Sequence, residues 1–262
     1  MTADQTLLGR RILVTRATEQ ADELVEMLST RGAEPISVPV MRLQRLLTSE
    51  QFRELGEGIA SGKWDDVIFT SANAVRLVLD RFPRSSQATR VFAIGPGTAS
   101  AAADLGWSVE SLPESFVAES LAERLLSERM AGRRLLLPRA AGARAVLPDA
   151  LERAGAQVEV VALYEMQPEE GSREPLRRVL AEPGLNCITF ASASAVACFR
   201  QLASGQTVPD GALVACIGPI TAEEARKAGM EPVLVAREHT LPGLVSALES
   251  HLRELPQNER LS

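Results

Sequence analysis

The feature that most constrains the fold of this chain is an internal repeat. Three pairs of stretches, about 120 residues apart, match each other: RILVTR at 11–16 with RLLLPR at 134–139, FTSANAV at 69–75 with FASASAV at 190–196, and AIGPGTA at 93–99 with CIGPITA at 216–222. Gly32 and Gly155 correspond at the same offset as Arg16 and Arg139. Agreement over most of the chain indicates a duplication, so two copies of one fold are expected.

Each copy alternates short apolar runs with amphipathic segments of helix length. This alternation is typical of βαβ units around a parallel sheet. The predicted fold class is therefore α/β, with two similar parallel-sheet α/β domains, and 262 residues suffice for two cores. Strands are predicted near 11–15, 35–40, 66–70, 91–94, 108–112, 134–138, 157–164, 187–191, 213–217 and 233–236. Helices are predicted near 18–31, 50–61, 72–82, 97–105, 117–130, 143–154, 172–182, 193–204, 219–228 and 241–254, followed by a frayed tail at 255–262.

Composition excludes several classes of function. A net charge of −6 argues against general nucleic-acid binding, which normally needs a basic surface. The cysteines, Cys187, Cys198 and Cys216, lack the close spacing of a zinc or redox pair and are expected to be buried thiols. His239 and His251 are the only histidines, so neither a metal site nor a Ser-His pair is expected, and no cofactor is predicted.

No membrane segment is predicted either. The start, MTADQTLLGRR, lacks the apolar stretch of a secretory signal, and no run approaches the roughly 18 to 20 apolar residues that span a bilayer. A cytoplasmic location is expected. Lys63 and Lys227 are the only lysines, and neither lies in an apolar setting that would favour a Schiff base. The many arginines suit carboxylate recognition or reflect codon usage.

Four turns at predicted strand ends carry the candidate binding residues. In open α/β sheets ligands bind at the carboxyl ends of strands, where helix N-termini present free N–H groups. Ser71 in one copy, and Ser192 or Ser194 in the other, can cap the following helix; the two Gly-Pro turns begin further helices. Ordinary helix caps would have the same sequence. The binding residues predicted from the turns are Ser71, Ala72, Asn73, Gly95, Thr98, Ser192, Ala193, Ser194, Gly218, Pro219 and Thr221.

Arginines and one tyrosine complete the candidate site. Arg16 and Arg139 follow predicted strands, with Arg144 shortly after, and a guanidinium can bind a carboxylate through two bonds unless it is simply a solvated surface group. Tyr164 is the only tyrosine and ends the predicted strand VEVVALY, where the other copy has Met41. Its phenol can donate a proton, although a tyrosine here also fits a core position with a wetted hydroxyl. The two copies are expected to hold a polyanionic small molecule between them.

The chain resembles the uroporphyrinogen-III synthase family over nearly its whole length. The matching stretches are ILVTRATEQADELVEMLSTRGAEPISVPV, DDVIFTSANAV, VFAIGPGTA, GRRLLLPRAAGARAVLPDALERAGAQVEVVALYEM, FASASAV and CIGPITAEEARKAG, in the family's order. Ala17 departs from the proline that is common after the first arginine. The resemblance implies a cofactor-free enzyme that closes hydroxymethylbilane, a linear tetrapyrrole with eight carboxylates, to uroporphyrinogen III with loss of water and inversion of ring D.

The resemblance also implies residue roles and an exchange of segments. Tyr164 is the implied acid, and Ser71, Ser192 and Thr221 match hydroxyls that bind substrate. The implied organisation has a first domain from 1–36 and 167–262, a second from 43–158, and connector strands at 37–42 and 159–166. A monomer that receives its unstable substrate by transient contact with the preceding enzyme of the pathway is expected.

Two other interpretations stay open from the sequence. A sensor of the same fold would bind a tetrapyrrole or another anion and act through a separate protein without catalysis. A two-domain solute-binding protein would need an export signal, which the start of this sequence lacks.

Overall fold

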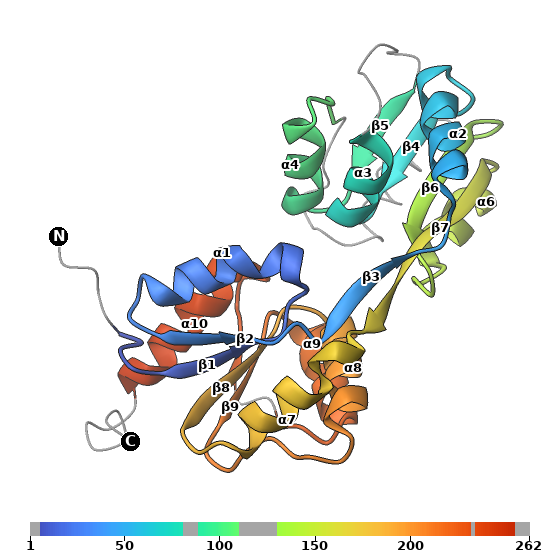
Figure 1. Cartoon of the computed structure of the whole chain (residues 1–262). Helices are drawn as coiled ribbons and strands as arrows, with labels where there is room; N and C mark the ends of the chain where they lie inside the picture. The colour runs from blue at the N-terminus through green and yellow to red at the C-terminus, as the bar shows by residue number, and fades with distance from the viewer. Residues whose placement is uncertain (1–5, 81–88, 110–129, 232–233, 255–262) are drawn as a thin grey trace. The chain divides into compact units, whose positions relative to one another are not determined.

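The computed structural model describes residues 6–80, 89–109, 130–231 and 234–254. The chain divides into two compact units. Unit 1 consists of Met1–Leu43 and Met166–Ser262, and unit 2 of Gln44–Glu165. Each unit contains one five-stranded sheet with helices packed against it (Figure 1). The predicted α/β class with two parallel-sheet units is confirmed.

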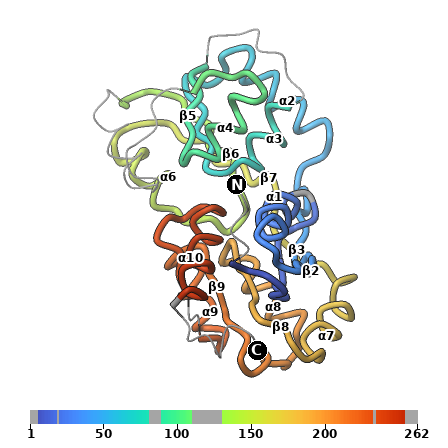
Figure 2. The backbone as a smooth tube through the Cα atoms, turned by 90° about the vertical axis from the view of Figure 1, so that its left-hand side faces the viewer, coloured from blue at the N-terminus to red at the C-terminus, as the bar shows by residue number. Residues whose placement is uncertain are grey.

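The sheet of unit 1 is built from strands that lie far apart in the chain. Its order is β10-β9-β8-β1-β2. The strands are β1 (Arg11–Val14), β2 (Glu34–Ser37), β8 (Leu185–Phe190), β9 (Leu213–Cys216) and β10 (Leu234–Val235), and they pair in parallel. Figures 1 and 2 show the blue amino-terminal strands beside the gold and orange strands β8 and β9. Thr15 and Thr189 reinforce the β1–β8 pair, since each hydroxyl donates to a carbonyl of the opposite strand, at 2.7 and 2.9 Å.

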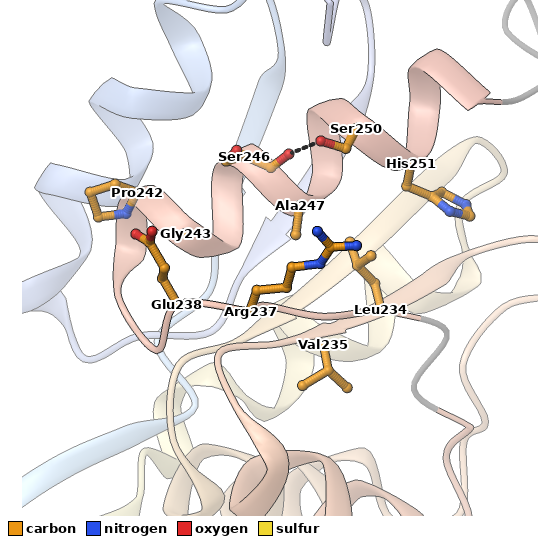
Figure 3. A pocket seen from close by; sticks show the side chains of 10 residues that line it. All are labelled: Leu234, Val235, Arg237, Glu238, Pro242, Gly243, Ser246, Ala247, Ser250 and His251. Carbon is orange, nitrogen blue, oxygen red and sulfur yellow. Dashed lines mark hydrogen bonds between the residues drawn. The ribbon is translucent and has the colours of Figure 1, made fainter. Parts of the chain in front are cut away.

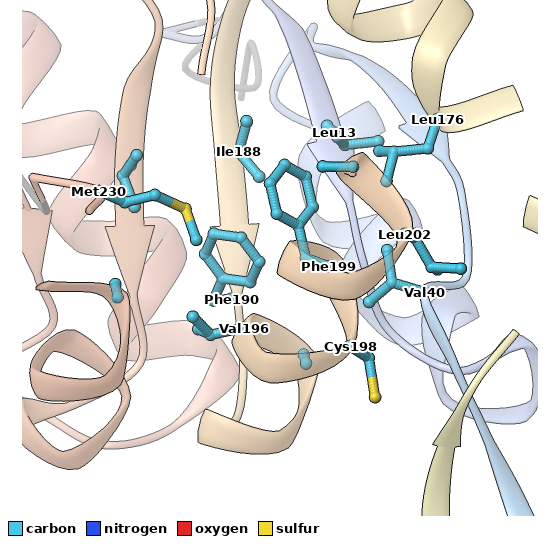
Figure 4. Close-up of a cluster of buried hydrophobic side chains, with 14 of the residues drawn as sticks. Leu13, Val40, Leu176, Ile188, Phe190, Val196, Cys198, Phe199, Leu202 and Met230 are labelled. Carbon is cyan, nitrogen blue, oxygen red and sulfur yellow. The ribbon is translucent and has the colours of Figure 1, made fainter. Parts of the chain in front are cut away.

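Helices cover both faces of this sheet. Two of them, α1 (Thr18–Ser29) and α10 (Leu241–Glu254), pack on one face, and α7 (Arg173–Ala181), α8 (Ala193–Ala203) and α9 (Pro219–Lys227) on the other, with a 3₁₀ turn, η1 (Glu170–Ser172), before α7. Figure 4 shows the core on the α8 face, where Phe190 and Phe199 meet edge to face with ring centroids 5.3 Å apart. Apolar residues of both chain segments fill these cores, so unit 1 needs both segments to bury them.

Unit 2 contains a similar sheet with the strand order β3-β7-β6-β4-β5, in which β7, β6, β4 and β5 pair in parallel. The strands are β3 (Met41–Arg45), β4 (Asp66–Phe69), β5 (Arg90–Ala93), β6 (Arg134–Ala140) and β7 (Gln157–Pro168), and the helices are α2 (Ser49–Ala60), α3 (Ala72–Leu79), α4 (Pro96–Asp104) and α6 (Val146–Arg153). Thr48 begins α2 with a reciprocal capping box with Gln51. Leu135, Leu137, Leu147 and Leu151 pack α6 onto one face of the sheet.

Several predicted boundaries differ from the structure. The strand predicted at 35–40 ends at Ser37, and β3 begins at Met41. Pro39 lies in the interruption, and a proline cannot donate a ladder hydrogen bond. In the other direction, β7 continues to Pro168, beyond the predicted end at Tyr164. The predicted strand 108–112 lies largely outside the described residues, as do the helix 117–130, except for its last residue, and the tail 255–262.

Candidate active site

The serine predicted to cap a helix in unit 2 does so. Ser71 follows β4 in an extended conformation, and its Oγ accepts the N–H of Ala74 at 3.2 Å. Ala72 and Asn73 are the first two residues of α3, and the start of a helix carries backbone N–H groups that the helix itself does not satisfy. The first turn of α3 therefore presents donors and the positive end of the helix dipole at the carboxyl end of β4.

Tyr164 lies next to this corner. It is 4% exposed, and its Oη is 2.9 Å from Ser71 Oγ. Tyr164 stands inside β7 rather than at its end, which corrects the sequence prediction, but it pairs with Ala140, the last residue of β6. Because β6 lies between β7 and β4, the phenol reaches across the end of one strand to meet the serine. No local pattern could have indicated a bond between residues 93 positions apart.

The Gly-Pro turn of unit 2 starts α4 as predicted. Gly95 has φ 84° and ψ 154°, a conformation essentially confined to glycine, and Pro96 occupies the first helical position. Thr98 follows in the first turn with its side chain 6% exposed. The turn thus places a second helix N-terminus after β5, the strand next to β4.

Arg139 is a buried cation within β6. The prediction that it follows the strand is wrong, because β6 extends to Ala140. The side chain is 7% exposed and donates to the carbonyl of the exposed Arg144 at 2.6 Å. Burial lowers the pKa of Arg139 below its ordinary value. Among the described residues no carboxylate pairs with it, so its charge is only partly compensated.

Unit 1 repeats the serine corner without the phenol. Ser192 follows β8, and its Oγ accepts the N–H of Ala195 at 3.2 Å. Of the two serines offered by the sequence, Ser192 is the cap, while Ser194 is exposed on the first turn of α8 beside Ala193. The position matching Tyr164 is the buried Met41, whose thioether donates no hydrogen bond.

The second Gly-Pro turn differs from the first in its backbone and in its neighbour. Gly218 is extended, with φ −176°, and Pro219 begins α9. A Cβ on Gly218 would meet the ring of His239 at 3.0 Å, so a side chain here would require that ring to shift. Thr221, in the first turn, is 4% exposed. Sequence reasoning left His239 out of the site, and the only signal for it was the rarity of histidine in this chain.

Arg16 lies in the connection between β1 and α1, as predicted. It is half-buried, and its guanidinium donates to the carbonyl and to the side-chain oxygen of Gln20, at 2.8 and 3.3 Å. Burial lowers its pKa, partly offset by Glu23. Arg16 therefore folds over the first turn of α1, beyond the carboxyl end of β1, which lies between β8 and β2 in the sheet of unit 1.

The cysteines are poor nucleophiles in this fold. Burial raises the pKa of Cys216 to about 11 and that of Cys187 further, and it also raises that of Cys198. In the described part of the chain, no group of three or more His, Cys, Asp or Glu could hold a metal ion, and no helix is long and apolar enough to cross a membrane.

Two cavities of unit 1 lie away from the predicted residues. One, of about 540 Å³, lies between β10 and α10 (Figure 3). Arg237 extends toward α10 there, and Ser250 Oγ donates to the carbonyl of Ser246. The other, of about 530 Å³, lies along the loop at 205–212. Neither contains a predicted site residue, so the candidate site rests on the strand ends described above.

A family model decides between the interpretations of this geometry. The model described as uroporphyrinogen-III synthase HemD matches residues 22–246, most of the chain. The chain belongs to the uroporphyrinogen-III synthase family. A uroporphyrinogen-III synthase of Synechococcus elongatus is 31% identical over 96% of this chain and 99% of its own length. One from Chlorobaculum parvum is 24% identical over 93% of this chain and its full length.

Solved structures show the same fold. A mutant uroporphyrinogen III synthase of Thermus thermophilus superposes with a TM-score of 0.61 at 16% identity, covering 94% of this chain and all of the other. The uroporphyrinogen-III synthetase of Helicobacter pylori gives 0.61 at 15% identity, with 93% of this chain covered and all of the other. At these identities the likeness concerns the fold. Family membership rests on the sequence matches.

Proposed function

We propose that the chain is a uroporphyrinogen-III synthase, which closes hydroxymethylbilane to uroporphyrinogen III with loss of water and inversion of ring D. Membership of the family makes it a cyclising lyase of haem biosynthesis. The observation that links the reaction to particular residues is the contact of Tyr164 with Ser71 at the carboxyl edge of the unit 2 sheet. An ionisable hydroxyl at this edge lies where open α/β sheets bind ligands.

Tyr164 assists the departure of the terminal hydroxyl. The carbon–oxygen bond breaks with its electron pair on oxygen, and a hydrogen bond from the phenol stabilises the charge that develops there. The leaving oxygen takes up a proton and departs as water, and the last ring, which closes through a spiro intermediate, releases one proton in return. Holding the flexible bilane in the geometry that closes this way is the other contribution, because orientation alone can lower a barrier substantially.

Each unit has its own candidate donors for carboxylates of the substrate. The starts of α3 and α4 in unit 2, and of α8 and α9 in unit 1, offer backbone N–H groups and positive dipole ends. Arg139 supports this assignment most strongly, since a buried guanidinium without a carboxylate partner among the described residues is costly until an anion approaches. Arg16 and Arg144 are proposed as further carboxylate donors.

The test is to supply hydroxymethylbilane and to separate the oxidised products by isomer. Excess type III product over a heat-inactivated control is expected. Only the spontaneous type I product, at the rate of the control, would make the chain a binder or a regulatory protein instead. Binding measured in parallel with a non-cyclising tetrapyrrole carboxylate separates that outcome from loss of the folded protein.

We further propose that the chain acts as a cytoplasmic monomer that receives the bilane by transient contact with the preceding enzyme, and that residues 37–42 and 159–166 act as the connector strands. Support for the connector is that the division between the units falls within β3 and β7. Sedimentation of the chain, alone and with the preceding enzyme, tests the monomer and the contact. A stable dimer of the isolated chain would contradict the first.

A further inference from the structure

A short chain of hydrogen bonds runs from the start of α3 to the phenol. The N–H of Ala74 donates to Ser71 Oγ at 3.2 Å, and Ser71 Oγ lies 2.9 Å from Tyr164 Oη. Within the described residues, neither hydroxyl has another hydrogen-bond partner. One proton therefore lies between the two oxygens, and one hydroxyl proton points elsewhere.

Either hydroxyl could donate in this pair, and the helix end acts on the choice between them. A hydroxyl that accepts an N–H bond becomes a stronger donor, because successive hydrogen bonds polarise one another. The positive end of the α3 dipole acts in the same direction, since it favours negative charge beyond the serine. Ser71 carries both effects and Tyr164 carries neither, so the helix end favours donation by Ser71, in opposition to the greater intrinsic acidity of a phenol.

We propose that Ser71 is the positioning residue of Tyr164: it donates to Oη and leaves the phenol proton free for the departing hydroxyl of the substrate. The step on the substrate rests on the proposed function, whereas the direction of the Ser71–Tyr164 bond does not. As the carbon–oxygen bond breaks, the phenol proton shifts toward the leaving oxygen, and the bond from Ser71 offsets the charge left on Oη. After water has left, the last ring loses one proton as it closes, and this proton replaces the one that the phenol gave up.

The second copy shows that a serine can cap its helix without contacting a phenol. Ser192 caps α8 through the same 3.2 Å bond that Ser71 makes to α3. At the matching position of the repeat stands Met41, which offers no oxygen. A serine cap is therefore sufficient without a phenol, and the bond to Tyr164 is an additional feature of unit 2.

The direction of the bond can be measured without any substrate. Tyr164 is the only tyrosine, so the tyrosine Fermi doublet in an ultraviolet resonance Raman spectrum reports this phenol alone. Its intensity ratio distinguishes a phenol that accepts a hydrogen bond from one that donates. We expect the acceptor pattern in the wild-type protein and in Ser71→Thr, its loss in Ser71→Ala, and no change in Ser192→Ala, which removes the matching cap. A donor pattern in the wild-type protein, or an unchanged doublet in Ser71→Ala, overturns the proposal.

Kinetics test the consequence for the reaction. Ser71→Ala is expected to lower kcat about tenfold with KM within about twofold of wild type, Ser71→Thr to restore most of it, and Ser71→Ala to have no further effect in a Tyr164→Phe background. Additive losses in the double variant would show that Ser71 acts independently of the phenol and would overturn the proposal. If the wild-type chain forms no type III product, the proposed function fails while the Raman result still decides the direction of the bond.

Discussion

The amino ends of the central strands are built alike in the two units. In unit 2, Asp65 accepts the backbone N–H of Arg134 at 2.8 Å, and the guanidinium of Arg134 donates to the carbonyl of Gly62. In unit 1, Asn186 accepts the backbone N–H of Arg11 at 2.8 Å, and the guanidinium of Arg11 donates to the carbonyl of Pro183. These contacts fasten neighbouring strands, and they are present in both copies.

The next position along the strand shows where the copies diverge. Asp66 is fully buried in unit 2 and pairs with Arg90 and Arg133 at 2.6 and 2.7 Å, whereas its counterpart in unit 1 is the buried thiol of Cys187. The copies diverge in the same way at the other end of the sheet, where unit 2 has Tyr164 and unit 1 has Met41. Contacts that hold the backbone are shared by the copies, while the buried carboxylate of Asp66 and the phenol of Tyr164 occur in unit 2 alone.

The largest effect is expected at Asp66. Asp66→Ala should lower the free energy of unfolding of unit 2 by about 3 kcal/mol, since it leaves two arginines without their buried partner. Cys187→Ala should cost unit 1 only about 1 kcal/mol. Both tryptophans, Trp64 and Trp107, lie in unit 2, so their fluorescence in urea follows that unit alone. An equal shift of this transition in both variants would contradict the comparison.

The phenol should account for the next largest effect. Tyr164→Phe is expected to lower kcat about 100-fold, at the lower end of what a positioned acid contributes, with little change in KM. Met41→Leu, at the matching position of unit 1, keeps the volume of the side chain and should leave kcat within about twofold of wild type. Steady-state formation of type III product measures both. Nearly full activity in Tyr164→Phe would remove the chemical distinction between the copies.

The two Gly-Pro turns should respond differently to a methyl group. Gly95→Ala forces a side chain into φ 84° and should cost unit 2 about 2 kcal/mol. Gly218→Ala meets no backbone strain, and the exposed His239 can move away, so a loss of about 0.5 kcal/mol is expected. Urea unfolding gives the two costs, and the NMR signals of the His239 ring should shift only in Gly218→Ala.

The smallest effect concerns pH. The hydrogen bond from the Arg134 backbone lowers the pKa of Asp65 below its ordinary value, followed by the bond from the Arg134 side chain. The contribution of this carboxylate to stability is therefore complete above about pH 4 and is lost as the pH falls through the lower folded-state pKa. Asp65→Asn copies the non-titrating Asn186 and should flatten the acid limb of the tryptophan-monitored stability curve. A limb as steep as that of wild type would contradict this assignment.

Local features of the site could be predicted from sequence. A serine after a buried strand can accept an N–H of the first helical turn, and this bond involves only residues close in sequence. Ser71 and Ser192 were therefore identifiable as caps. Gly-Pro at a strand exit indicated both further helix starts for the same reason. The repeat established the class of fold, because two copies of a βαβ pattern leave few alternatives.

Long-range features could not be predicted in this way. The Ser71–Tyr164 bond depends on which strands are neighbours in the sheet, and that order is not visible in the pattern of one strand. Arg139 was misplaced because the strand was predicted to end at Pro138, whereas β6 continues to Ala140. His239 was passed over because its contact is with the backbone of Gly218, which no metal or catalytic motif describes.

The pairing of β1 with β8 also governs the order in which the protein folds during synthesis. Thr15, which follows β1, bonds to Thr189 of β8, 174 residues later. The ribosome therefore needs on the order of 10 to 35 s after β1 to supply β8. Residues 44–165 are complete before Thr189 is added and can fold first. Until then, the apolar strand Arg11–Val14 has only β2 to pair with, and its other edge is the part of the nascent chain that a chaperone would be expected to shield.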